Sequence, residues 1–162
     1  MIGKKNVPPN IILLVIEMIE GLSHITFIVH DLERMTHFLK MIFEAEEVYC
    51  SGDKSFSLAK EKFFEIGNVW IAVMEGEPLS EQTYNHIAFK IADSEFETYV
   101  ERVQSVGVEM PEGCSRVEGE GKSLYFYDYD NHLFELHTRT LKERLERYHR
   151  VTAAEQLDGA VG

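Results

Sequence analysis

The sequence repeats itself once, and this repeat constrains the fold more than any other feature. His24 lies seven residues before Asp31, and His86 lies seven residues before Asp93. The residues between them, ITFIVH and IAFKIA, alternate in the same phase, and the two copies are offset by 62 residues (86 minus 24). Because neither copy alone could close a sheet, we expect the two modules to pair and to bury their apolar faces.

Each copy begins with a strand and a helix. Residues 22–29 and 85–91 are rich in β-branched and apolar side chains, which predicts strands. Asp31 and Asp93 then stand at positions where they would cap a following helix. The apolar residues recur at helical spacing: Leu32, Met35, Phe38, Leu39, Ile42 and Phe43 in the first copy, and Phe96, Tyr99, Val100 and Val103 in the second. The second helix should end at Gly107.

The remaining predicted strands are short, and they complete the two modules. They are residues 48–50, 62–66 and 69–74 in the first copy, and 108–110 and the two halves of 125–137 in the second. The pattern predicts an α+β fold made of two βαβββ modules, over residues 20–75 and 84–138. Thr140 is predicted to cap a last helix over residues 140–150, followed by a frayed tail over 151–162. Residues 1–17 are expected to be a disordered or loosely packed extension before one domain over 18–150.

The composition excludes several classes of protein. The net charge is −12 and acidic residues are spread along the chain, so we expect neither nucleic acid nor an anionic membrane as a partner. Cys50 and Cys114 have no CxxC spacing and are too few for a secreted disulfide framework, which indicates a cytoplasmic protein. The apolar run over residues 11–16 is far shorter than the roughly 20 residues of a membrane span.

The segment over residues 125–137 indicates a metal site. Glu135 interrupts an apolar strand, and a buried carboxylate needs a cationic partner because an unpaired buried charge is very costly. His24 and His86 occupy equivalent strand positions in the two copies. Two imidazoles and one carboxylate are a ligand set for a divalent first-row metal. The alternative is that each histidine is an ordinary hydrogen-bonded sheet residue and that Glu135 is solvated.

From residue 18 to about residue 150, the sequence resembles the fosfomycin-resistance proteins of the vicinal oxygen chelate (glyoxalase–bleomycin resistance) superfamily. The segments GLSHITFIV, TYNHIAFKI, EGEGKSLYFYDYDNHLFELH and TLKERLERY carry the resemblance, and SGDKSFSLAKEKFF is similar to the subclass that hydrates the epoxide. The resemblance implies a homodimer in which modules from different chains pair, with His24 from one chain and His86 and Glu135 from the other holding the metal. It implies Mn(II), with Fe(II) or Zn also suited to these ligands, and no organic cofactor.

The same resemblance implies roles for further residues. Glu61 would be the general base that deprotonates water, with Glu46, Glu47 and Glu65 as competing carboxylates. Thr26 and Tyr84 would lie near the metal and the oxirane. The residues implied in phosphonate binding are Ser123, Tyr125 and Arg144, with Arg116 and Lys122 as additional cations. The loop over residues 116–121 lacks the serine and lysine of the potassium loop in thiol-transferring relatives.

The expected substrate is fosfomycin, a small epoxide with a phosphonate group, or a related molecule. The expected reaction is metal-dependent hydration to the vicinal diol, which gives fosfomycin resistance. Two alternatives remain open: transfer of a thiol to fosfomycin on the same fold, and sequestration of a drug by a metal-free binding protein. A ring-cleaving dioxygenase is a more distant alternative, since those relatives usually carry more modules.

Overall fold

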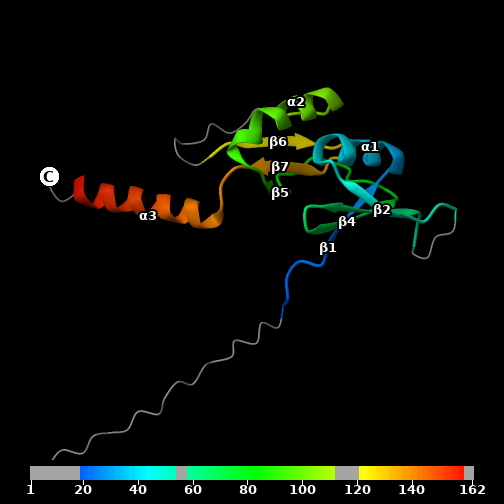
Figure 1. The fold of residues 1–162 in the computed structure, drawn as a ribbon, viewed down its shortest axis with the longest axis horizontal. Helices are drawn as coiled ribbons and strands as arrows, with labels where there is room; N and C mark the ends of the chain where they lie inside the picture. The colour runs from blue at the N-terminus through cyan, green and yellow to red at the C-terminus, as the bar shows by residue number, and fades with distance from the viewer. Residues whose placement is uncertain (1–18, 54–57, 112–120, 159–162) are drawn as a thin grey trace, which may run out of the picture.

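The computed structural model describes residues 19–53, 58–111 and 121–158, and it contains both copies of the repeat. The elements in chain order are β1 (His24–Val29), α1 (Leu32–Phe43), β2 (Glu46–Cys50), β3 (Glu61–Ile66), β4 (Val69–Glu75), β5 (His86–Lys90), the 3₁₀ turn η1 (Asp93–Glu95), α2 (Phe96–Val106), β6 (Ser123–Tyr127), β7 (Leu133–His137) and α3 (Leu141–Asp158). Figure 1 shows two sheets with α1 and α2 packed beside them, which confirms the predicted α+β class.

The two sheets share one strand order, as the repeat predicts, except that the first has four strands and the second has three. The first sheet has the order β1-β4-β3-β2 and the second has the order β5-β7-β6. In each sheet the strand that opens the module runs parallel to the strand that closes it, β1 beside β4 and β5 beside β7. His24 and His86 are therefore both the first residue of a strand at a sheet edge, and each of these edges is unpaired within the described part of the chain.

The second module departs from the prediction in two places. Residues 108–110 form no strand, although the backbone N–H of Tyr127 donates to the Glu109 carbonyl at 2.9 Å. The prediction that Asp93 caps a helix is wrong, because Asp93 begins the 3₁₀ turn η1 and Glu95 precedes α2 without a side-chain cap. Asp31 does cap α1, since its carboxylate accepts from the Arg34 N–H at 3.0 Å. Gly107 ends α2 with φ 70°, as predicted.

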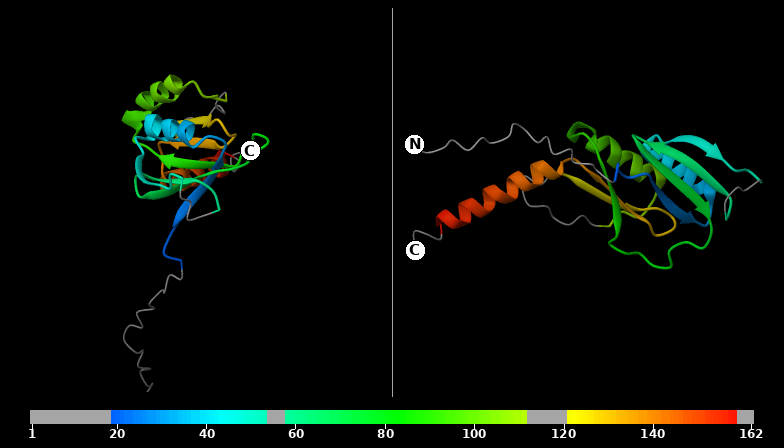
Figure 2. Two further views of the ribbon diagram at one scale, coloured as in Figure 1. Left: turned by 90° about the vertical axis from the view of Figure 1, so that its right-hand side faces the viewer. Right: turned by 90° about the horizontal axis from the view of Figure 1, so that it is seen from below.

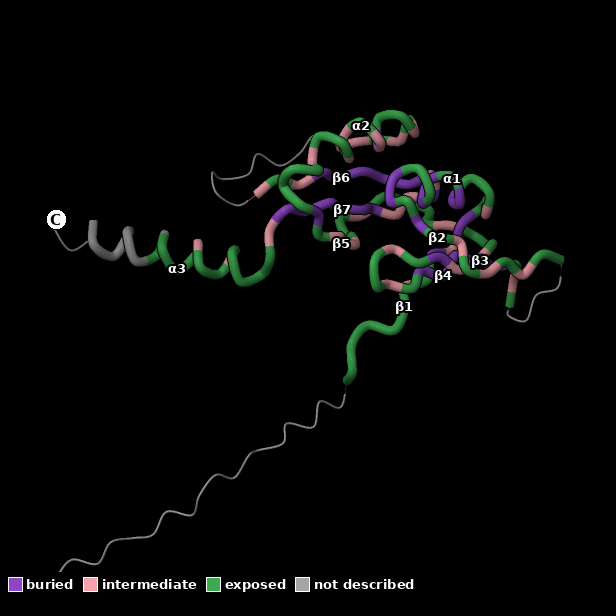
Figure 3. The backbone as a smooth tube through the Cα atoms, viewed as in Figure 1, coloured by how far each residue is buried: buried purple, intermediate pink, exposed green. Residues whose placement is uncertain are grey.

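Both modules share one apolar core, and α1 lies at its centre. Phe38 is fully buried and contacts Phe134 of β7, with ring centroids 5.3 Å apart. Phe43 contacts Phe89 of β5 at 5.2 Å. Truncation of a buried phenylalanine such as Phe38 to alanine typically costs about 3–5 kcal/mol of stability. The helix therefore fixes the two sheets relative to each other. Figure 3 shows buried positions along β6 and β7 and on α1.

The last helix projects away from the two sheets (Figures 1 and 2). Thr140 caps it as predicted: the Glu143 N–H donates to the Thr140 hydroxyl at 3.3 Å, and the Thr140 N–H donates to the Glu143 carboxylate at 2.7 Å. The helix continues to Asp158, past its predicted end at residue 150. Within the described part of the chain, no helix is both long enough and apolar enough to cross a bilayer. The predicted extension over residues 1–17, Cys114 and Arg116 lie outside the described residues.

Candidate metal centre

The turn between β6 and β7 sets the register that presents Glu135. The Asp128 carboxylate accepts from the backbone N–H groups of Asp130, at 2.8 Å, and His132, at 2.9 Å, and Asn131 adopts φ 69°. From this turn, alternate side chains of β7 point to opposite faces of the sheet. Phe134 and Leu136 enter the core, whereas Leu133, Glu135 and His137 share the other face.

On this second face, His86 meets Glu135. The imidazole Nε2 lies 3.0 Å from the carboxylate Oε2, and the Glu135 side chain is only 6% exposed. The Nδ1 atom of His86 lies 2.8 Å from the Tyr84 carbonyl, which can only accept, so this nitrogen carries a proton. In the neutral imidazole, Nε2 then presents a lone pair toward a carboxylate oxygen. Two facing acceptors need a proton or a metal cation between them or beside them.

The separation of these two atoms fits a metal ion. Two ligand atoms at about 2.1 Å from an ion and at right angles to each other are roughly 3.0 Å apart, as in an octahedral site. Tetrahedral angles at the same bond length would separate them by roughly 3.4 Å. The His86–Glu135 pair, at 3.0 Å, therefore suits two adjacent positions of an octahedral ion. The carbonyl behind His86 is a usual support for a metal-bound imidazole.

A cavity of about 270 Å³ opens beside this pair. Ala88 lies opposite Glu135 in the neighbouring strand, and its small side chain leaves this space. The residues lining the cavity are His86, Ala88, Glu135, His137, Arg139, Thr140, Leu141 and Arg144. Arg139, just before α3, and Arg144, in its first turn, thus bring two guanidinium groups next to the candidate metal ligands, which favours an anionic ligand.

Arg139 is a candidate binding residue that sequence reasoning missed. It is the second residue after β7, and its Nε is buried without a hydrogen-bond partner among the described residues. Its Nη1 lies 3.3 Å from a Glu143 carboxylate oxygen. Hydrogen bonds from the Thr140 backbone and hydroxyl lower the pKa of the Glu143 carboxyl to about 2, so this carboxylate holds Arg139 and Thr140 across the neutral range. The position of Arg139 just after the Glu135 strand was the available signal.

The other residues implied in substrate binding differ in which side chains they contact. The Tyr84 and Tyr125 hydroxyls are 3.3 Å apart, and both rings contact the His86 ring. The Ser123 hydroxyl is bound to Glu135 and His137. Lys122 points elsewhere, since its ammonium lies 3.0 Å from Glu97 of α2.

His24 stands on the outer face of the first sheet, turned away from α1. Its ring packs against Trp70 with centroids 4.4 Å apart, and Trp70 contacts Phe63 at 5.1 Å. Because Lys62 and Phe64 point to the α1 side, where Lys62 reaches Thr36, the alternate residues Glu61 and Phe63 share the outer face with His24. Glu61 is 8% exposed. Thr26 is on this face as well, two residues after His24.

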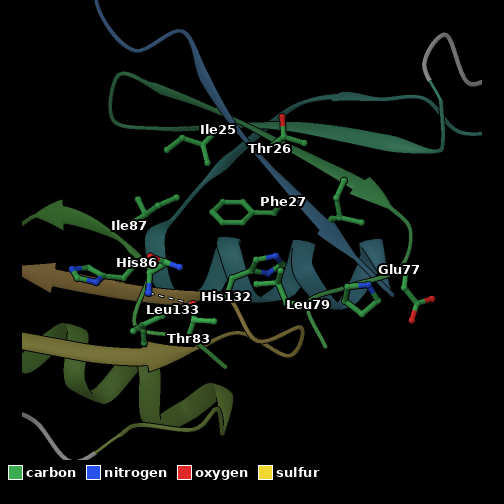
Figure 4. Close-up of a pocket in the computed structure, with 13 residues that line it drawn as sticks. Ile25, Thr26, Phe27, Glu77, Leu79, Thr83, His86, Ile87, His132 and Leu133 are labelled. Carbon is green, nitrogen blue, oxygen red and sulfur yellow. Dashed lines mark hydrogen bonds between the residues drawn. The ribbon is translucent and has the colours of Figure 1, made fainter. Parts of the chain in front are cut away.

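A single chain does not bring all three predicted ligands together. Among the described residues, no three histidine, cysteine, aspartate or glutamate side chains form a metal cluster. His86 and Glu135 meet, but His24 does not join them. Between β1 and β5 lies a cavity of about 530 Å³, bordered by Thr26 and Ile25 from β1 and by His86 and Ile87 from β5 (Figure 4). The unpaired edges of the two strands thus face a space that the chain leaves open.

Comparison with known proteins shows the family. Residues 21–136 match the model of the Glyoxalase/Bleomycin resistance protein/Dioxygenase superfamily. The chain is 64% identical over 132 residues to the fosfomycin resistance protein FosX of Listeria monocytogenes, covering 82% of this chain and 99% of the relative. It is 37% identical over 145 residues to the metallothiol transferase FosB of Shouchella clausii, covering 86% of this chain and 94% of the relative.

Among solved structures, a point mutant of FosX from Listeria monocytogenes was determined with Mn(II) and 1S,2S-dihydroxypropylphosphonic acid. It superimposes with a TM-score of 0.75 and 58% identity, covering 82% of this chain and all of that one. The family match covers residues 21–136, which include both sheets and their shared strand order. The chain belongs to the glyoxalase/bleomycin resistance protein/dioxygenase superfamily.

Proposed function

We propose that this protein is a metal-dependent hydrolase that adds water to the epoxide of fosfomycin and thereby gives resistance to it. The observation that carries the proposal is the His86–Glu135 pair, 3.0 Å apart, beside a cavity lined by Arg139 and Arg144. The FosX relatives support the substrate, and the relative solved with Mn(II) and a dihydroxypropylphosphonic acid supports both the metal and a diol product. We propose Mn(II) as the metal, with Fe(II) and Zn as ions that the same ligands accept.

The cationic side of the cavity accounts for phosphonate binding. Arg144 and Arg139 provide guanidinium donors, which bind phosphonate oxygens through charge-assisted hydrogen bonds. On a chain with a net charge of −12, such a local cationic site is what an anionic substrate requires. Tyr84 and Tyr125 add hydroxyl groups next to His86. These residues orient the substrate so that its epoxide faces the metal ligands.

A bound Mn(II) would supply Lewis-acid stabilisation for the oxygen of the opening ring. The chain supplies the rest. The Glu61 carboxylate accepts a proton from a water molecule as the water oxygen forms a bond to the carbon next to phosphorus. The carbon–oxygen bond of the ring at that carbon breaks, and the released oxygen takes up a proton to become the second hydroxyl. Burial of Glu61 at the start of β3 excludes bulk water from the base.

We propose that the working unit is a homodimer with a shared site. His24, Thr26 and Glu61 are on the outer face of one sheet, whereas His86 and Glu135 are on the outer face of the other. The unpaired edges of β1 and β5 and the cavity between them leave a surface for a second copy. On α3, the side chains of Leu141, Leu145 and Tyr148 are exposed and lie at helical spacing. This apolar stripe begins at the cavity beside His86 and Glu135, which Leu141 lines, and it adds to the surface available to a second copy. The second copy would complete the ligand set with its own His24.

The direct test is product analysis with Mn(II), fosfomycin and no thiol. We expect phosphorus NMR to show conversion to the diol, with one oxygen atom from ¹⁸O-labelled water in the product. Glu61→Gln should remove the conversion. Glu65→Gln is the matched control, because Glu65 is an exposed carboxylate on the same face of the same strand. No conversion by the wild-type protein, or conversion only when a thiol is added, would refute hydration.

The second candidate is transfer of a thiol to fosfomycin, which the similarity to metallothiol transferase FosB favours. Replacement of Glu61 by glycine separates the two reactions. Hydration should collapse, because water needs the base, whereas attack by an added thiol should largely survive. Sequestration of a drug without catalysis would leave protein purified without chelator free of metal, and metal analysis distinguishes that outcome.

A further inference from the structure

Ser123 and His137 form a hydrogen-bonded pair directly behind Glu135. The two residues are register partners in β6 and β7, so their side chains stand next to each other on the face that carries Glu135. The Ser123 Oγ lies 2.7 Å from His137 Nδ1 and 2.5 Å from Glu135 Oε1. His137 is 9% exposed and Glu135 is 5% exposed. This contact is therefore built into the sheet and shielded from water.

The chemistry of the three groups fixes the direction of both hydrogen bonds. An ionised carboxylate only accepts, so the single hydroxyl proton of Ser123 is donated to Glu135. The Nδ1 of His137 then carries a proton and donates it to the serine oxygen, an assignment that follows from the network. The carboxylate is consequently held at Oε1, while Oε2 is left facing His86 at 3.0 Å.

We propose that His137 is a positioning residue for the candidate metal centre and that it acts through Ser123, because its Nδ1 lies 2.7 Å from the Ser123 hydroxyl but 3.6 Å from Glu135 Oε1, beyond hydrogen-bonding distance. His137 orients the serine hydroxyl, and the hydroxyl holds the Glu135 carboxylate so that Oε2 is presented to the metal. This proposal rests on the metal site of the proposed function. It gives Ser123 a different role from the phosphonate contact that the family resemblance implies, because its only proton is already donated to Glu135.

The arrangement repeats on the second ligand. The Tyr84 carbonyl holds the Nδ1 of His86, as the Ser123 hydroxyl holds Oε1 of Glu135. In each predicted ligand, the supporting group thus contacts one atom, and the other atom faces the partner ligand, with His86 Nε2 3.0 Å from Glu135 Oε2. Loss of such a supporting group typically lowers metal affinity by about 10–100-fold.

The test is Mn(II) binding without substrate, followed by electron paramagnetic resonance of the free ion. We expect Ser123→Ala and His137→Leu each to lower the affinity by about 10–100-fold. The double variant should be no weaker than Ser123→Ala, because His137 acts through the serine. His137→Asn, which keeps a donor near the position of Nδ1, should restore most of the affinity. Lys90→Met is the control, since exposed Lys90 is the other register neighbour of His137.

Thermal unfolding of the metal-free variants shows whether each remains folded. If His137→Leu does not fold, His137→Asn still tests the proposal. Mn(II) affinity within twofold of wild type in Ser123→Ala, with weaker binding of fosfomycin, would overturn the proposal and return Ser123 to the phosphonate. Losses that multiply in the double variant would overturn the route through Ser123. If the wild-type protein binds Mn(II) but forms no diol, the proposed hydration is refuted and the role of His137 is not. The two outcomes are distinct because the Mn(II) titrations contain no substrate.

Discussion

The indole of Trp70 lies against the imidazole of His24, with ring centroids 4.4 Å apart. Trp70 is the only tryptophan in the chain, so its fluorescence reports on a predicted metal ligand. We expect paramagnetic Mn(II) to quench this fluorescence in a saturable way, because the ion would be held at the ring that Trp70 contacts. His24→Ala should abolish the saturable quenching, and His30→Ala, outside the predicted ligand set, should not. Unchanged quenching in His24→Ala would show that His24 is not a metal ligand.

Complementation between two inactive variants tests the shared site. His24→Ala and His86→Ala should each be inactive, since each lacks one ligand in every site. In a mixed dimer, one site carries both substitutions and the other carries neither, so random co-assembly should restore about a quarter of the wild-type activity. The measurement is diol formation after co-expression of two differently tagged chains. If the ligands came from one chain, the mixture would stay inactive.

Glu61→Gln should lower kcat by about 10²–10⁴-fold, the usual contribution of a general base. The Mn(II) affinity should stay within a fewfold of wild type, because Glu61 is outside the predicted ligand set. Steady-state kinetics by phosphorus NMR measure kcat, and the Trp70 fluorescence titration measures the metal. An equal loss of metal affinity in Glu61→Gln would assign Glu61 to the metal instead of to the water.

Arg144→Ala should raise KM for fosfomycin about 10–100-fold, because a charge-assisted hydrogen bond is worth about 1.5–3 kcal/mol. Arg139→Ala should raise KM in the same direction, since its guanidinium lines the same cavity. Lys142→Ala is the control on the same helix, with a side chain that is 85% exposed. Arginine variants with wild-type KM would place the phosphonate elsewhere.

The ion pairs of Glu47 with Lys40 and Lys62 predict a dependence of stability on pH. A hydrogen bond from Lys40 lowers the pKa of Glu47; burial opposes this shift, and the charge of Lys62 adds to it. A carboxyl with a lowered folded pKa stabilises the fold above its unfolded value of about 4.5, and this contribution is lost as the pH falls through the lower folded value. Urea unfolding between pH 7 and pH 3 should therefore show a steeper loss for wild type than for Glu47→Gln. Glu46→Gln, at an exposed carboxylate without an ion pair among the described residues, should follow wild type.

The strands that carry the candidate site were predictable because the sequence carries local periodicity. The alternation around Glu135 predicted a carboxylate on a strand, and the repeat predicted that His24 and His86 would occupy equivalent strand positions. The register of the strands that carry them is tightly set, because a slip of one residue in strand pairing would move every side chain to the other face of the sheet. Asp93 misled because a carboxylate at a strand end suits a 3₁₀ turn as well as a helix cap.

Tertiary structure decided the features that depend on approach between distant segments. No local pattern indicates that the Ser123 hydroxyl is committed to Glu135, that Lys122 turns to Glu97, or that Arg139 enters the cavity. Side-chain direction at such positions is set by packing across strands and by the start of α3, which periodicity does not encode. The sequence by itself determined the two modules and the residue types of the candidate metal centre. Only the folded chain decided which of these residues meet, because β5 pairs with β7 and brings His86 to Glu135, whereas His24 lies on β1 of the other sheet.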